Sequence, residues 1–210
     1  MAQDAALGLT VLFAAMLAAR LHFAPGHGRP PWLTLTVMLL VAAGLAAQLV
    51  SPGLLPRFER NGPAIADGQS FRLFTALWFQ DGGLRGGLYN LATLLIVGAS
   101  AEQYWDRRLW LLLYFGVGLA IEGLAMWWQP VGAGNSIAVF GLAGSLLALT
   151  WERKLAILAL RAIGLIAALA LAWQHDIHGA AAVLGAISGL AFSRSRWVRN
   201  QNPVREFSAA

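Results

Sequence analysis

The stretch Gly134-Asn135-Ser136-Ile137-Ala138-Val139-Phe140-Gly141 joins a turn to the start of an apolar helix. Glycine and asparagine favour the turn, whereas the residues from Ile137 onward belong to an apolar run that reaches residue 151. A helix that is apolar all round is typical of a bundle core or a membrane. We therefore expect Ser136 to lie near one end of a buried helix.

Similar runs occur at 5–23, 32–50, 84–104, 109–128, 134–151, 155–173 and 177–193. Each is close to the roughly 20 residues that a helix needs to cross a bilayer, and none alternates as a barrel strand does. Hydrophobic residues make up 58% of the 210 residues and charged residues only 12%, whereas soluble domains have about 25% charged residues. The sequence predicts an all-α integral membrane protein with seven transmembrane helices in a lipid bilayer.

The formal net charge of +5 does not indicate nucleic-acid binding, because the basic residues stand between the apolar runs and not along one face. The cytoplasmic side of a membrane protein carries the excess of Arg and Lys. If the 20–31 loop is cytoplasmic, only four basic residues lie outside: Arg57, Arg60, Arg72 and Arg85. Ten then lie on the cytoplasmic side: Arg20, Arg29, Arg107, Arg108, Arg153, Lys154, Arg194, Arg196, Arg199 and Arg205. We expect an outside N-terminus and a cytoplasmic C-terminus, in a bacterial inner membrane.

Four further features complete the outline of the chain. The absence of cysteine excludes disulfides and thiol nucleophiles. The long connection at 51–83 is rich in proline and aromatic residues, so we expect short helices in the outer interface. Arg161, inside the sixth run, is expected to snorkel to the cytoplasmic surface. The N-terminus lacks the basic region of a cleaved signal peptide, so we interpret 5–23 as a retained helix.

Three polar residues, Asn90, Ser136 and His178, interrupt the outer ends of their runs at the same depth. Each lies about 16 residues before a charge at the other end of its run, Asp106, Glu152 and Arg194 respectively. At 1.5 Å per residue this separation is roughly 24 Å. The three side chains are therefore expected in one layer below the outer surface.

Small residues follow helical spacing in the fifth and seventh runs and allow close helix packing. They are Ala138, Gly141, Gly144, Ser145 and Ala148 in the fifth run and Ala181, Ala182, Gly185 and Gly189 in the seventh. Close contact of these helices would bring His178 toward Ser136. A neutral imidazole within hydrogen-bond reach of a serine makes it a nucleophile for acyl transfer. Backbone N–H groups at Gly134 and Asn135, with the Asn90 amide, would support the oxyanion.

These motifs resemble those of the rhomboid intramembrane serine proteases. Gly134-x-Ser136 and the residues after it look like the family's G-x-S-G motif, and His178 followed by small residues resembles its last core helix. Further similarities are Phe71-Arg72 to the Trp-Arg of the first outer loop, Asn90 to the end of H-x-x-x-N, and Glu102 to the end of the second core helix. The resemblance implies a six-helix core at 32–194, preceded by an extra helix and cytoplasmic loop at 1–31 and followed by a polar cytoplasmic tail at 195–210.

The resemblance also implies roles. Ser136 would be the nucleophile, His178 the general base and acid, and Asn90 an oxyanion donor, with Glu102 and Arg72 as structural supports. The reaction would be hydrolysis of a peptide bond in or next to a transmembrane segment, without a cofactor.

Two departures from the family pattern keep alternatives open. The histidine of H-x-x-x-N falls on Gly86, and the glycine after the nucleophile falls on Ile137. Loss of one oxyanion donor costs about 10²- to 10³-fold in rate, unless Gln80 or Arg85 replaces it. A catalytically silent protein that binds transmembrane clients is the first alternative, and a transporter or channel built around Glu122 is the second. A metal site at His175, Asp176 and His178 is a weaker reading.

Overall fold

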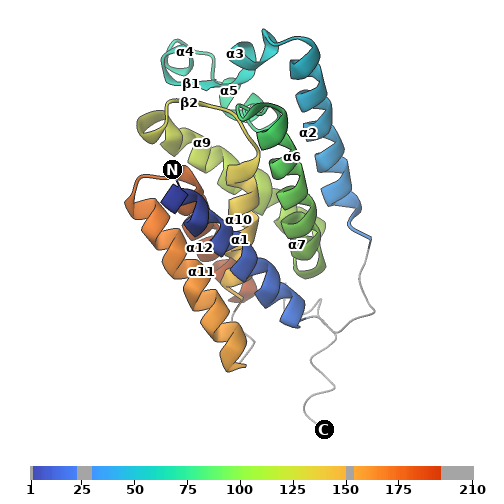
Figure 1. The fold of residues 1–210 in the computed structure, drawn as a ribbon, viewed down its shortest axis with the longest axis vertical. Helices are drawn as coiled ribbons and strands as arrows, with labels where there is room; N and C mark the ends of the chain where they lie inside the picture. Colours follow the sequence, from blue (N-terminus) through green and yellow to red (C-terminus); the bar gives the residue numbers. More distant parts are fainter. Residues whose placement is uncertain (1, 23–29, 150–153, 195–210) are drawn as a thin grey trace.

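The computed structural model of the chain describes residues 2–22, 30–149 and 154–194 (Figure 1). All seven predicted apolar runs form helices, which confirms the all-α prediction. The helices are α1 Ala2–His22, α2 Trp32–Val50, α6 Gly83–Thr93 continued by η1 Leu94–Gly98 and α7 Ala99–Tyr104, α8 Arg107–Leu111 continued by η2 Leu112–Gly116 and α9 Val117–Trp128, α10 Ser136–Leu147, α11 Leu155–Trp173 and α12 Ile177–Arg194. η1 and η2 are π-helical turns.

Within the described residues, three helical segments are long and apolar enough to cross a membrane: Trp32–Val50, Arg107–Trp128 and Leu155–Trp173. That the remaining four runs also cross it stays a prediction. The predicted tail at 195–210 lies outside the described residues, as do Glu152 and several of the predicted cytoplasmic charges, Arg29, Arg153, Arg196, Arg199 and Arg205.

Helix α10 lies at the centre of the molecule, and all of its residues from Ile137 to Leu147 are buried. Figure 1 shows it between α11 on one side and α6 and α2 on the other, with α1 and α12 beside it. A helix that is apolar on every face can satisfy this position because it has no polar face to expose. Ser136 is therefore held at the end of the most enclosed helix.

Helices α10 and α12 pack so closely that their backbones touch. A Cβ at Gly144 would overlap the carbonyl group of Ala182, and a Cβ at Gly185 would overlap that of Gly141. One turn further along, a Cβ at Gly189 would lie 2.8 Å from the Cα of Ser145. The predicted contact between the two strips of small residues is confirmed.

The connection from 51 to 82 folds over one end of the bundle. It contains the short helices α3 Leu54–Phe58, α4 Gly62–Ala66 and α5 Arg72–Thr75, as the sequence predicts. The sequence did not predict a two-residue antiparallel pairing of β1, Arg60–Asn61, with β2, Val131–Gly132. Two residues are too few to show the alternation by which a strand is recognised.

Two arginines, one in this connection and one in the sixth run, are buried. The side chain of Arg60 is 3% exposed and forms an ion pair with Glu122, which is 1% exposed. Arg161 does not reach the surface, since it is 5% exposed and donates a hydrogen bond to the carbonyl of Leu149. Both guanidinium groups find acceptors inside the protein, which offsets the cost of burying their charge.

Candidate functional site

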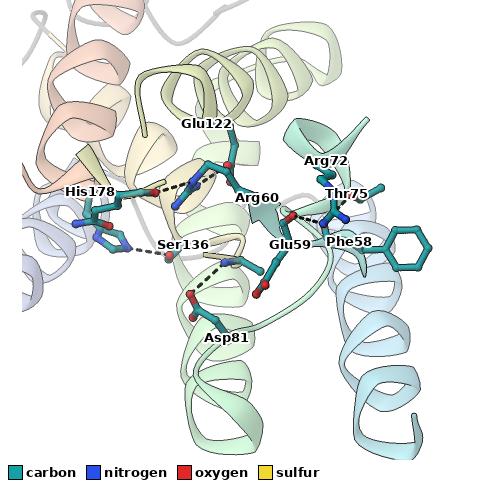
Figure 2. A network of polar contacts seen from close by, with 11 residues as sticks. Phe58, Glu59, Arg60, Arg72, Thr75, Asp81, Glu122, Ser136 and His178 are labelled. Carbon is teal, nitrogen blue, oxygen red and sulfur yellow. Dashed lines mark hydrogen bonds and ion pairs between the residues drawn. The ribbon is translucent and has the colours of Figure 1, made fainter. Parts of the chain in front are cut away.

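The turn before Ser136 is held by the connection that covers the bundle. Asp81 Oδ2 accepts a hydrogen bond from the backbone N–H of Ala133 at 3.0 Å. Figure 2 shows the Asp81 carboxylate pointing toward this strand of the turn. The Asp81 N–H donates in return to the carbonyl of Ala133, and Gly134 N–H donates to that of Ala76. Two backbone–backbone bonds and one bond to the Asp81 carboxylate thus fix the path of the chain immediately before α10 begins.

The buried ion pair of Arg60 and Glu122 supports the same turn from the other side (Figure 2). Arg60 Nε also donates to the carbonyl of Gln129 at 2.9 Å, and a Cβ at Gly132 would lie 2.8 Å from its guanidinium. Arg60 therefore ties β1 to α9 and to β2. Glu122 Oε2 is engaged by Arg60, whereas Glu122 Oε1 has no hydrogen-bond partner in the described part of the chain. The ion pair gives Glu122 a structural role, which does not favour a transporter built around it.

Two other residues singled out in the sequence also serve structure. Glu102 accepts hydrogen bonds from the backbone N–H groups of Leu33 and Thr34 at 3.0 and 2.9 Å and so caps the start of α2. Arg72 donates to the carbonyls of Pro56 and Glu59 at 2.9 and 3.0 Å. Neither side chain lines the cavity at Ser136.

Ser136 and His178 are in hydrogen-bond contact. The Ser136 Oγ atom lies 2.9 Å from His178 Nε2, across the close packing of α10 on α12 (Figure 2). The Phe140 ring, one helical turn after the serine, packs edge-on against the imidazole with centroids 5.0 Å apart. Contact of a hydroxyl with an imidazole nitrogen is the geometry that allows proton transfer from serine to histidine.

The second nitrogen of the imidazole contacts Asp176. His178 Nδ1 lies 2.9 Å from Asp176 Oδ1, and the same oxygen accepts the backbone N–H of His178 at 2.7 Å. Burial raises the pKa of the Asp176 carboxyl, but the hydrogen bonds and charge of His178 outweigh burial and hold it below its usual value. The sequence reading considered Asp176 only as a metal ligand. An acid directly before an apolar run signals a helix cap, and this signal pointed to its position.

Three side-chain amides form a hydrogen-bonded chain, in which Gln80 and Asn135 are buried and Asn90 is partly buried. Asn90 Nδ2 donates to Gln80 Oε1 at 2.7 Å, and Gln80 Nε2 donates to Asn135 Oδ1 at 3.2 Å. Gln48 holds Gln80 in turn through two bonds to its backbone, at 2.7 and 2.8 Å. Gln80 thus orients Asn90, a role that the sequence reading did not consider.

The polar atoms of this region converge on Gly134. A Cβ there would lie 3.4 Å from Asn90 Nδ2, 3.5 Å from Ser136 Oγ and 3.6 Å from Gln80 Oε1. The Gly134 N–H already donates to the carbonyl of Ala76, so it is not free for the oxyanion role that the sequence predicted for it. The N–H groups of the first turn of a helix have no partner within the helix and point toward its N-terminus, which in α10 is the end that carries Ser136.

A cavity of ≈ 440 Å³ opens over these groups. Its lining includes Asn90, Ser136 and His178, so the three residues expected at one depth share one space. Its other lining residues are Asp4, Ala5, Gly8, Leu9, Asp81, Gly82, Gly86, Tyr89, Phe140, Leu171 and Asp176. The extra helix α1 therefore forms one wall of the cavity.

The two departures from the expected motif occupy different places. Gly86 lines the cavity, and a Cβ there would meet no atom within 4 Å. Ile137 is 2% exposed and lies in the hydrophobic core. It stands one turn before Gly141, whose side-chain position points at Val117 of α9, so we infer that Ile137 faces α9 and not the contact with α12. Arg85 is exposed and does not line the cavity.

A metal site finds no support in the described parts of the chain. Within residues 2–22, 30–149 and 154–194, no group of three or more His, Asp or Glu side chains is arranged to hold an ion. The His175 ring packs against Trp128 instead, with centroids 5.1 Å apart.

Comparison with known proteins gives one finding. The profile of the Rhomboid domain matches residues 67–198. This range contains Asn90, Ser136 and His178, and it covers more than half of the chain. No curated protein matches the sequence.

Proposed function

The chain belongs to the rhomboid family, and we propose that it is an intramembrane serine endopeptidase that uses a Ser136/His178 dyad. The observation that carries the proposal is the 2.9 Å contact between Ser136 Oγ and His178 Nε2, at the floor of a cavity that Asn90 also lines. The substrate would be a transmembrane protein, cut in or next to its membrane segment.

In the proposed mechanism, Ser136 Oγ attacks the carbonyl carbon while its proton passes to His178 Nε2. Asn90 and the N–H groups at the start of α10 stabilise the oxyanion, with Gly134 and Asn135 shaping the turn. The proton then passes from Nε2 to the leaving amine as the C–N bond breaks. A water molecule repeats these steps on the acyl-enzyme, which releases the carboxylic acid and restores the serine.

The proposal includes an orientation and a division of the chain. We propose a bacterial inner membrane, with the N-terminus outside and the C-terminus in the cytoplasm. The core would be 32–194, with an added N-terminal segment at 1–31 and a cytoplasmic tail at 195–210. The wall that α1 contributes to the cavity gives the added segment a place in substrate binding.

Serine-directed labelling tests the proposed function. The purified protein in detergent is expected to react with a fluorophosphonate, because the imidazole activates Ser136, and the Ser136→Ala and His178→Ala variants are expected to lose this labelling. Gel fluorescence and intact mass measure it. A folded, unmodified protein that is not labelled would contradict the protease proposal. The result would then favour a silent binder of transmembrane clients, the second candidate, which the lack of an imidazole at Gly86 supports.

Gly86 offers a test by gain of activity. The substitution Gly86→His is expected to raise the rate of fluorophosphonate labelling about tenfold, because it adds an oxyanion donor at a position that lines the cavity and has room for a side chain. The matched control is Gly86→Ala, which adds a Cβ and helix propensity but no donor. Equal rates for the two variants would show that an imidazole at this position does not reach the oxyanion.

A further inference from the structure

We propose that Asp176 is a positioning residue that holds His178 in the orientation and tautomer that catalysis needs, so that the site works as a Ser136–His178–Asp176 triad. This inference rests on the proposed function. It concerns a residue that the dyad mechanism does not use.

The connection between α11 and α12 determines where Asp176 lies. At the end of α11 the N–H of His175 donates to the carbonyl of Ala172, and the N–H of Asp176 donates to that of Leu171. This pair of bonds is the Schellman motif that ends many helices, and it requires a left-handed residue. His175 takes this conformation with φ 59°, which is uncommon for a residue other than glycine. The two hydrogen bonds and the left-handed conformation of His175 therefore fix the path of the chain between α11 and α12.

The same turn starts α12 with Asp176 as its cap. Asp176 Oδ1 accepts the backbone N–H of His178 at 2.7 Å and lies 2.9 Å from the Nδ1 atom of the same residue. One carboxylate oxygen thus fixes both the backbone and the ring of His178. The two side chains are 22% and 32% exposed, so the contact is partly shielded from water.

This geometry determines which nitrogen can act as the base. A carboxylate accepts hydrogen bonds and donates none, so Nδ1 must carry a proton, and the lone pair of neutral His178 lies on Nε2, facing Ser136 Oγ. When Nε2 takes the serine proton, the ring becomes positive and the adjacent carboxylate stabilises it without accepting the proton itself. The low pKa of Asp176 keeps that carboxylate charged at neutral pH.

Other titratable groups share the cavity with His178. Asp4 of α1, Asp81 before α6 and Tyr89 of α6 line the same cavity as His178. The residues of α10 and α11 that line it, Ser136, Phe140 and Leu171, carry no charge. Asp4, Asp81 and Tyr89 are unchanged in a variant of Asp176. A change in the pH dependence of labelling in that variant is therefore attributed to the substitution of Asp176.

The substitution Asp176→Asn separates positioning from capping. Asparagine caps helices about as well as aspartate, so the thermal midpoint should stay close to that of the unmodified protein. The labelling rate is expected to fall about 10- to 100-fold, and its pH profile to change, because the carboxylate that lies against His178 Nδ1 becomes a neutral amide. The matched control is Asp106→Asn, since Asp106 caps α8 through the N–H groups of Arg108 and Leu109. It should change neither the rate nor the profile.

Two measurements distinguish an error in this inference from an error in the proposed function. Labelling that is unchanged in rate and pH profile in Asp176→Asn overturns the positioning role and leaves the protease intact. If the unmodified protein does not react with the fluorophosphonate at all, the positioning role is tested by NMR of protein that contains ¹⁵N-histidine. The His178 signals are assigned with the His178→Gln variant. An Nδ1-protonated ring that changes tautomer or mobility in Asp176→Asn supports positioning; identical spectra overturn it.

Discussion

Replacing Ser136 with alanine is expected to lower the rate at which the purified protein cuts a transmembrane reporter peptide by a factor of about 10⁴ or more. Loss of a serine nucleophile has effects of this size because its oxygen forms the acyl-enzyme. His178→Ala should cause a similar loss, since the two side chains act as one unit at 2.9 Å. The measurement is single-turnover cleavage in detergent micelles or proteoliposomes, followed by mass spectrometry of the products.

The same experiment separates a protease from a silent binder. Ser136→Ala should still capture the uncut reporter, because the substitution removes one atom from a cavity of ≈ 440 Å³. Ser100→Ala is a matched control: this serine is in α7 and its hydroxyl donates to the carbonyl of Ile96, away from the cavity. Cleavage that persists in Ser136→Ala, at the rate of Ser100→Ala, would rule out Ser136 as the nucleophile.

Gly144→Ala is expected to destabilise the folded protein by about 3 kcal/mol, at the upper end of the usual range for overpacking. The new methyl group would overlap the carbonyl of Ala182, and backbone atoms cannot move aside as a flexible side chain can. Helices α10 and α12 would have to separate, and with them Ser136 and His178. A lower thermal midpoint in detergent and a lower labelling rate at a temperature where the variant is still folded would measure the two consequences.

The control for this substitution is Gly123→Ala in α9. A Cβ at Gly123 meets no atom within 4 Å, so the change tests helix propensity without crowding. It should leave the stability unchanged or raise it by up to about 1 kcal/mol. Gly144→Ala and Gly123→Ala proteins with the same thermal midpoint and labelling rate would contradict the close contact of α10 with α12.

The sequence alone was sufficient for the helices and for the close packing of α10 on α12. Apolar runs of membrane length and strips of small residues are properties of near neighbours in the chain, and such patterns can be read directly. The strips predicted the contact of α10 with α12. Counting residues from the charged end of each run predicted the shared depth of Asn90, Ser136 and His178. The catalytic roles of these residues remain predictions until labelling and cleavage are measured.

Other features depended on tertiary structure. Gln80 with Asn90, and Arg60 with Glu122, become partners only because the connection at 51–82 folds back over the bundle. Asp176 is close to His178 in sequence, but its carboxylate reaches the ring because His175 adopts a left-handed conformation. Hydrophobic periodicity in the sequence indicates which helix faces are buried, because the hydrophobic effect scales with the apolar area buried and does not depend on the direction of individual contacts. A hydrogen bond depends on distance and angle, and the packing of the whole chain decides those.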